Sequence, residues 1–411
     1  MAYYYIILSM FIMLAYFYDY RKLTLMRGFW LVMMWLILVC VAGFRYHVGF
    51  DSRYYEYEYP DMPTLLTLAD YDFSDTRYQP LYIVFTAIAR TISKEFMCLQ
   101  LLHALCLNTV IFWFFSKFTR HTFVALSLYF LMLFIPFNFE VLRESLAVSL
   151  FLLAWPYFLK QKWIKYYILV FIAFGFHISA AVTFLLPLLW CTKIRHILMY
   201  GRRTIVLCAI LAGVGLIVYQ NFFEILKGLS FLSMFSERID LYSGNDMGGM
   251  ALNVNGVIVN LTRDAVYPLL AIYFLQKRLK YREVSQEERD TLLKEEMVSM
   301  CGVYIVVLSI FIFILTRYNN YFLPVSILLV SDFVYSSVPK KRKNVRLNAF
   351  TWWMIFLPLF FMQAYNVTFT KLNPPRYTIG MIYSYNSQFN PQNKKEVEEA
   401  YRSQQWFRLK R

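Results

Sequence analysis

The chain has 411 residues, of which 59% are hydrophobic and 20% aromatic, and its mean hydropathy is +0.46. Soluble domains are about 45–50% apolar, and here the excess lies in long runs, which excludes a soluble globular protein and the short alternating strands of a β-barrel. The formal net charge of +15 is explained by Lys and Arg in loops expected on the cytoplasmic side, so no nucleic-acid partner is expected.

Ten apolar segments are candidates for helices that cross a bilayer. They are residues 2–18, 29–44, 96–115, 122–138, 145–159, 204–219, 256–275, 297–316, 319–335 and 349–364. Two further pieces are irregular. Residues 80–92 would make a helix of only about 20 Å, and residues 166–190 are interrupted near Gly175–Ser179.

Basic residues follow several of these segments, at Arg21–Arg27, Lys117–His121 and Lys160–Lys165. All of these loops lie on the cytoplasmic side only if residues 80–92 do not cross and residues 166–190 enter and return. We therefore predict an all-α polytopic integral membrane protein with about 10–12 transmembrane helices and one or two re-entrant or interfacial segments. If both irregular pieces cross, the count is twelve and Arg143 lies on the cytoplasmic side instead.

The domain organisation follows from these spans. Residues 1–365 are expected to form one integral membrane domain with external loops 45–79 and 220–255 and a cytoplasmic loop 277–296. Within that cytoplasmic loop, residues 283–296 are expected to form a charged helix that serves as a solvated connector. The tail 366–411 is expected to end in a charged amphipathic helix on the membrane surface. The six cysteines lie in or beside apolar runs, with no CxxC pair, and are interpreted as packing thiols.

A few ionisable residues lie at or near membrane depth, where each requires a partner or a function. They are Arg45 and Asp51 after the second apolar run, Glu140, Arg143 and Glu144 before another, His177 and Ser179 at the interruption, and Arg317 with Tyr321 between two late spans. The structural interpretations are snorkelling, an ion pair, a satisfied core histidine and a capped turn, respectively. The functional interpretation is that the arginines bind a phosphate and that Asp51 or His177 accepts a proton.

The external loop 45–79 is acidic and rich in tyrosine, including Tyr54 and Tyr55. Tyrosines at this density suit a membrane-interface belt. They also suit stacking on sugar rings, because an aromatic face meets C–H groups while the hydroxyl supplies a polar tip.

Four short patterns, in this order, resemble the EpsG family, which belongs to the Wzy-like bacterial polysaccharide polymerases. They are Arg45-x₃-Gly49-x-Asp51, Arg143-x₃-Ala147, Phe176-His177-x-Ser179-Ala180 and Arg317-x₃-Tyr321-Phe322. Two positions depart from the usual pattern. Gln79 stands where an acid is expected, which puts a general-acid role there in doubt, and Glu144 stands where Gln is more usual, which predicts a tighter pairing of Arg143.

The resemblance implies polymerisation of oligosaccharide repeat units carried on undecaprenyl pyrophosphate, at the outer face of a bacterial cytoplasmic membrane, by an inverting reaction with no metal and no cofactor. It implies that Arg45, Arg143 and Arg317 bind the pyrophosphate and that Asp51 or His177 is catalytic. Glu140, Glu144 and Ser179 would support the site, and Tyr54, Tyr55 and Tyr321 would hold sugar. A flippase and a chain-length regulator are the expected protein partners, and the product is an exopolysaccharide, a capsule or an O-antigen chain.

Two other classes use similar residues. A transporter or flippase of lipid-linked sugars would use the arginines for binding, but the internal repeats and paired broken helices frequent in transporters are not visible. A membrane acyltransferase acting on surface glycans would need a histidine on the cytoplasmic side, whereas the expected topology turns His177 outward.

Overall fold

Helices make up every element of the chain that the structure describes, which confirms the predicted all-α fold. The computed structural model describes residues 2–49, 51–74, 76–191, 193–194, 210, 261–279, 286–309 and 315–336. Of the expected span 204–219 only residue 210 is described, and the expected span 349–364, the loop 220–255 and the tail 366–411 lie outside these residues. The chain divides into two compact units, Met1–Ala181 with Ser337–Arg411, and Val182–Ser336, and each is described by itself.

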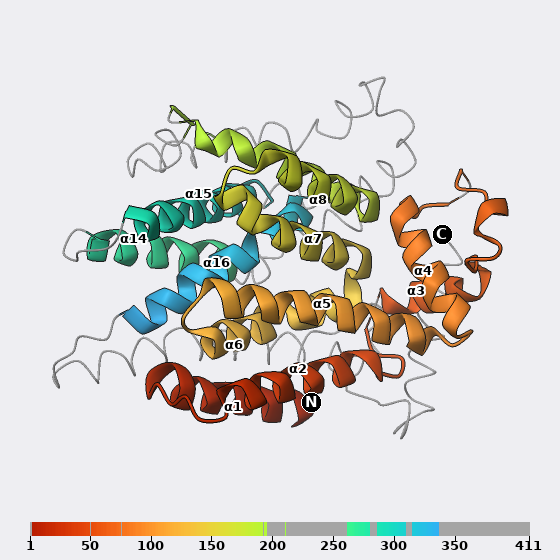
Figure 1. The fold of residues 1–411 in the computed structure, drawn as a ribbon, viewed down its shortest axis with the longest axis horizontal. Coiled ribbons are helices and arrows are strands. Elements are labelled where there is room, and N and C mark those ends of the chain that lie inside the picture. Colours follow the sequence, from red (N-terminus) through yellow and green to blue (C-terminus); the bar gives the residue numbers. More distant parts are fainter. Residues whose placement is uncertain are drawn as a thin grey trace. The chain divides into compact units, whose positions relative to one another are not determined.

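The first unit contains most of the described helices (Figure 1). Its elements are α1 (Ala2–Leu14) continued by η1 (Ala15–Tyr20), α2 (Arg27–Gly43), α3 (Ser52–Glu58), η2 (Tyr59–Asp61), η3 (Leu68–Asp70), α4 (Pro80–Ile92), α5 (Phe96–Phe118), α6 (Thr122–Met132), η4 (Pro136–Glu140), α7 (Leu142–Leu159) and α8 (Trp163–Phe176).

Among the described residues, α5 and α7 are long and apolar enough to cross a membrane. Their 23 and 18 residues correspond to about 34 and 27 Å. Six further apolar helices are shorter: Arg27–Gly43, Pro80–Ile92, Thr122–Met132, Trp163–Phe176, Ile178–Trp190 and Asp264–Tyr273. Together these apolar helices indicate an integral membrane protein.

The direction of the helices gives the first unit two distinct ends. The first residue of α2, Arg27, donates a hydrogen bond of 3.0 Å to Thr122 just after α5, whereas Gly43 at the end of α2 packs tightly on Leu101 near the start of α5. The first turn of α7 lies beside the first half of α5, since His103 and Ser145 are hydrogen-bonded at 2.8 Å. We call the end where α4, α5 and α7 begin the tyrosine end, and the opposite end, where α5 and α7 finish, the basic end.

Helix α4 stays at the tyrosine end. Near its start, Tyr82 and Ile83 pack with Leu146, and near its finish Ala89 packs with Leu142 and the aromatic ring of Tyr59. Both ends of α4 therefore contact the first turns of α7, and α5 begins only a few residues later. This arrangement supports the expectation that residues 80–92 do not cross the membrane.

A buried polar triad joins α5, α6 and the π-helix η4. The amide of Asn108 donates to Asn138 at 2.9 Å, and the Tyr129 hydroxyl bonds both of them at 3.1 Å. All three side chains are fully buried, so the triad satisfies polar groups that would otherwise be costly in an apolar core. It fixes η4, the segment that leads directly into Arg143.

The second unit includes η7 (Thr262–Val266), α14 (Tyr267–Leu279), α15 (Gln286–Ser309) and α16 (Thr316–Ser336). Helices α15 and α16 approach closely where Gly302 faces Phe322 and where Ser299 bonds Ser326 at 2.6 Å, as small residues allow between membrane helices. The helix η5 (Ile178–Trp190) spans the division between the units.

Two expectations for the second unit are wrong. Residues 286–309 form one continuous helix, which agrees with the helix expected over 283–296, but Glu295 and Glu296 in it are buried, so the expected solvation is wrong for these two residues. The expected polar turn at Arg317 is instead the first turn of α16. In both cases the polar side chains lie among packed helices, which hydropathy along the chain does not reveal.

Candidate functional site

Arg143 lies in the first turn of α7, inside a cluster of tyrosines at the tyrosine end. Its Nε donates to the hydroxyl of Tyr55 at 3.3 Å. Its Nη1 donates to the backbone carbonyl of Arg77 at 3.2 Å and to Oε1 of Gln79 at 3.1 Å. The guanidinium also lies 4.8 Å from the centroid of the Tyr78 ring, a cation–π distance. These contacts fix the plane and direction of the guanidinium.

We call the residues that contact the Arg143 guanidinium the cradle, and a second layer of contacts holds them in place. Arg77 pairs with Glu58 at 2.7 Å and donates to the Tyr78 hydroxyl at 3.1 Å, and the Tyr78 hydroxyl donates to Glu58. Burial raises the pKa of Tyr78, so its phenol stays protonated and remains a donor near neutral pH. The Glu58 carboxylate is thus engaged by Arg77 and Tyr78 rather than by Arg143.

Arg143 itself has no carboxylate partner within the described residues. The expected pairing with Glu140 or Glu144 is therefore wrong. One Oε of Glu140 accepts the backbone N–H of Asp51 at 2.6 Å, and Glu144 is 1% exposed on a different side of α7. Within the same described residues, Nη2 of Arg143 makes no hydrogen bond, so one edge of the cation remains to receive an anion.

The neutral side chain of Gln79 affects the charge balance around Arg143. An acid at position 79 would lie against the guanidinium, whereas the neutral amide of Gln79 orients Arg143 without neutralising it. The departure at position 79, not the one at position 144, thus determines the charge balance around Arg143.

Arg45 is fully buried beneath the same region. It donates to the carbonyl of Ala42 and to the Ser52 hydroxyl, the latter at 2.9 Å, and its guanidinium lies 5.0 Å from the Phe139 ring. These contacts join the end of α2 to α3 and η4. The geometry favours a role for Arg45 in holding α3, one turn before Tyr55, over direct contact with a ligand.

The segment between α2 and α3 turns sharply at Gly49. Its φ of 107° is a conformation that other residues rarely adopt, and a Cβ there would lie 2.8 Å from the carbonyl oxygen of Phe139. Asp51 then precedes α3 and places Tyr55 one turn later, facing Arg143. The neighbouring His47 is engaged by Glu56 at 2.9 Å.

His177 follows the last residue of α8 in an extended conformation, which confirms the predicted interruption. Helix α8 ends beside α4, where Gly175 approaches Leu81 closely and Phe176 packs on the cluster containing Tyr78 and Tyr82. The backbone N–H of Ser179 donates to Nδ1 of His177 at 3.2 Å, and the Ser179 hydroxyl lies 2.5 Å from the same nitrogen. The neutral ring therefore carries its proton on Nε2.

Arg317 and Tyr321 belong to the second unit. Tyr321 is fully buried in α16, which does not favour direct contact with a sugar. Neither unit alone brings together Arg45, Arg143 and Arg317, so the convergence of the three arginines stays a prediction.

Sequence reasoning missed several residues of the cradle and of the second layer of contacts. Glu58, Arg77 and Tyr78 lie in the tyrosine-rich loop, but nothing in the local pattern distinguishes them from the other charged and aromatic residues there. One signal was available: Arg77, Tyr78 and Gln79 directly precede Pro80, which begins α4. A loop residue that directly precedes a helix has its position fixed by that helix, and binding residues are often found on such loops.

The fold and this site define an all-helical polytopic protein with an arginine–tyrosine site at one end of its first unit. The EpsG family model matches residues 28–375, so the chain belongs to the EpsG family. This confirms the resemblance inferred from the short patterns, and membership implies a role in exopolysaccharide biosynthesis. Neither the curated proteins nor the solved structures include a match to the chain.

Proposed function

We propose that the protein is a membrane polymerase that joins oligosaccharide repeat units carried on a lipid pyrophosphate. The observation that carries this proposal is the guanidinium of Arg143, which is fixed on one side by Tyr55, Tyr78 and Gln79 and is not neutralised by a carboxylate among the described residues. Such a group is suited to bind a diphosphate, because its planar donors match two phosphate oxygens.

The proposed reaction displaces the lipid pyrophosphate from the donor sugar. A hydroxyl of the acceptor attacks the anomeric carbon, a new glycosidic C–O bond forms, and the C–O bond to pyrophosphate breaks with inversion. The electron pair leaves with the pyrophosphate, and the hydroxyl proton passes to a base. Arg143 stabilises the charge that grows on the leaving group, which is a stronger interaction in the transition state than in the ground state.

Of the two candidate bases, the geometry favours Asp51 over His177. Nδ1 of His177 already accepts the backbone N–H of Ser179, and Nε2 carries the proton of the neutral ring, so neither nitrogen offers a lone pair to a sugar hydroxyl. His177 is better suited to donate from Nε2. Asp51 is half-buried at the start of α3, one turn from the tyrosine that contacts Arg143.

Around the cation, Tyr54 and Tyr55 present aromatic rings from α3. The Tyr54 ring lies 5.5 Å from the guanidinium of Arg77, and the Tyr55 ring stacks on Tyr78 at 6.0 Å. We propose that this surface holds sugar residues next to the pyrophosphate. The tyrosine end would then face the outside of the cell, with the basic end in the cytoplasm.

This function is tested by measuring the length of surface polymer in cells where a variant replaces the wild-type chain. Arg143→Ala should abolish long polymer while the protein level and the lipid-linked single unit remain unchanged. Arg317→Ala should do the same if the second unit contributes to pyrophosphate binding. Lys94→Ala is the matched control, because Lys94 is exposed between α4 and α5 at the same end and should leave polymer length intact.

The same experiment separates the competing classes. Retention of long polymer in Arg143→Ala would contradict the role of Arg143 as a pyrophosphate ligand. Loss of the externally exposed single unit in that variant would favour a flippase, because a polymerase variant still receives translocated units.

A further inference from the structure

A cavity of about 550 Å³ lies at the basic end of the first unit, far along α2 and α5 from the arginine–tyrosine site. It forms between the loop that joins η1 to α2 and the loop that joins α5 to α6. Its ten lining residues include four cations and no carboxylate; the cations are Lys22, Arg27, Lys117 and Arg120. Hydroxyl groups of Thr24 and Ser116 also line it.

The first loop holds its cations in a defined conformation. Lys22 and Met26 both have positive φ, 57° and 58°, a conformation that side chains other than glycine adopt only where the surrounding structure imposes it. Arg27 follows at the start of α2. The two residues with positive φ thus lie on either side of residues 23–25, of which Leu23 and Thr24 line the cavity together with the end of α5.

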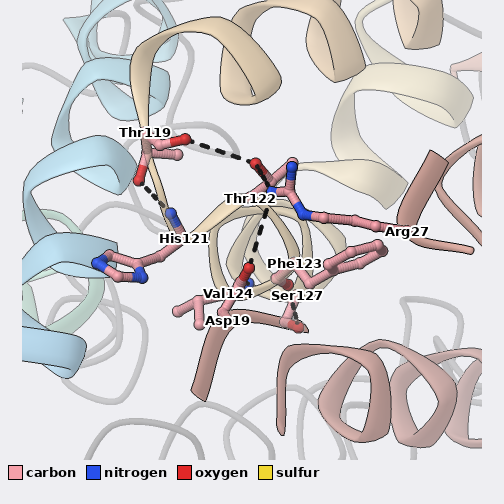
Figure 2. A network of polar contacts seen from close by, with 8 residues as sticks. All are labelled: Asp19, Arg27, Thr119, His121, Thr122, Phe123, Val124 and Ser127. Atoms are coloured by element: carbon pink, nitrogen blue, oxygen red, sulfur yellow. Dashed lines mark hydrogen bonds and ion pairs between the residues drawn. The ribbon is translucent and has the colours of Figure 1, made fainter. Parts of the chain in front are cut away.

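Figure 2 shows how Arg27 is positioned. Its Nη2 donates to the Thr122 hydroxyl at 3.0 Å and lies 4.0 Å from the carboxylate of Asp19, and its guanidinium lies 6.0 Å from the Phe123 ring. Asp19 does not line the cavity, and its other oxygen accepts the backbone N–H of Val124 at 2.8 Å. Asp19 therefore holds Arg27 from outside the cavity, and the residues that line the cavity carry only positive charge.

The topology rule alone does not explain this arrangement. That rule requires basic residues in cytoplasmic loops, at any position. The loop between α7 and α8 satisfies it with exposed Lys160 and Lys162, neither of which lines this cavity. Here two loops about ninety residues apart in sequence bring four cations and several hydroxyls to one hollow, which like-charge repulsion opposes unless an anion is bound.

We propose that this cavity, which we call the basic pocket, binds a phosphate-bearing anion at the end of the unit opposite the proposed active site. Its volume suits a phosphate with a small polar group attached. Lys and Arg supply charge, and Thr and Ser hydroxyls supply hydrogen bonds to phosphate oxygens. The source is either the headgroup of an anionic membrane lipid or a soluble phosphate, and both would be held by the same residues.

The double variant Lys22→Asn, Arg120→Gln tests the proposal with one change in each loop. Both side chains are exposed, and Asn tolerates the left-handed conformation at position 22. The matched control is Lys160→Gln, Lys162→Gln, which removes the same charge from a neighbouring loop. Purified full-length chain is titrated with phosphatidylglycerol, phosphatidylcholine and inorganic phosphate, and bound ligand is counted by native mass spectrometry. The Arg143→Ala variant is included to separate this pocket from the active site.

A lipid site predicts that phosphatidylglycerol binds more tightly than phosphatidylcholine and that the double variant weakens it about 30-fold, with little change in the control. A site for soluble phosphate predicts that inorganic phosphate binds to wild type and competes with the lipid, with the same loss in the double variant. The proposal would be overturned if the double variant bound phosphatidylglycerol and inorganic phosphate as well as wild type does. Correct folding of the double variant is judged by its elution profile and unfolding midpoint. Loss of binding in Arg143→Ala alone would also overturn it.

Discussion

The position of Arg143 predicts a large and graded loss of polymerisation when this side chain is changed. Arg143→Ala removes a fixed cation and its open Nη2 edge from the leaving group, and loss of one such preorganised donor lowers a rate by about 10²–10³, or about 2.7–4 kcal/mol. Arg143→Lys keeps the charge. A lysine cannot bond Tyr55, the Arg77 carbonyl and Gln79 together, so its ammonium is misplaced and a loss of about 10- to 100-fold is expected.

The assay is the initial rate at which purified protein converts lipid-pyrophosphate-linked repeat units into dimers and longer products. The loss should appear mainly in kcat, because the interaction strengthens as negative charge develops on the pyrophosphate. Lys94→Ala should retain the wild-type rate. A rate for Arg143→Ala within about threefold of wild type, or a loss confined to KM, would refute the proposed role of Arg143.

Four further predictions follow from individual contacts. Tyr78→Phe keeps the ring beneath Arg143 and should retain most activity, whereas Tyr78→Leu loses a cation–π contact and should lower the polymerisation rate about 5- to 30-fold; equal rates for the two variants would exclude that contact. Gly49→Ala should lower the thermal stability of the purified protein by about 1–3 kcal/mol, since its Cβ would meet the Phe139 carbonyl oxygen, and an unchanged unfolding midpoint would contradict this. Single cysteines placed at Lys117 and Lys160, in a chain without its native cysteines, should react only from the cytoplasmic side, and one at the exposed Leu66 only from outside; labelling of all three from one side would contradict the proposed orientation. Burial raises the pKa of Asp19 to about 7, so this carboxyl loses its negative charge as pH falls through 7, and binding of phosphatidylglycerol to the basic pocket should strengthen between pH 8 and pH 6.

The pH prediction has its own control. Asp19 faces Arg27 from α2 and the first backbone N–H groups of α6, and His121 directly precedes that helix. In Asp19→Asn the binding at pH 8 should match that of wild type at pH 6. The variant His121→Asn is measured beside it and should keep the wild-type slope. A wild-type slope that persists unchanged in Asp19→Asn would contradict the role of Asp19.

Features that depend on neighbouring residues were predictable from the sequence. Long apolar runs indicated α5 and α7, and the interruption near His177 was visible because Gly175, His177 and Ser179 break the apolar pattern. The family was also recognisable, because its short patterns occur in order along the chain.

Features that depend on contacts between distant segments were not predictable. Charge adjacency suggested that Arg143 pairs with Glu144, but successive residues on a helix point in different directions, and the guanidinium turns to Tyr55 and Gln79 instead. The Arg317 segment was predicted to be a polar turn, yet its polar side chains lie in the first turn of α16. The cavity between the two basic loops required knowledge of which loops meet.

The most direct test of the central claim is reconstitution of the purified protein in vesicles with lipid-pyrophosphate-linked repeat units and a metal chelator. Products are separated by size, and movement of the units across the bilayer is measured in the same vesicles. A ladder of products that differ by one repeat unit, absent with Arg143→Ala and present with Lys94→Ala, is the predicted result. Translocation of the units without any ladder would contradict the account.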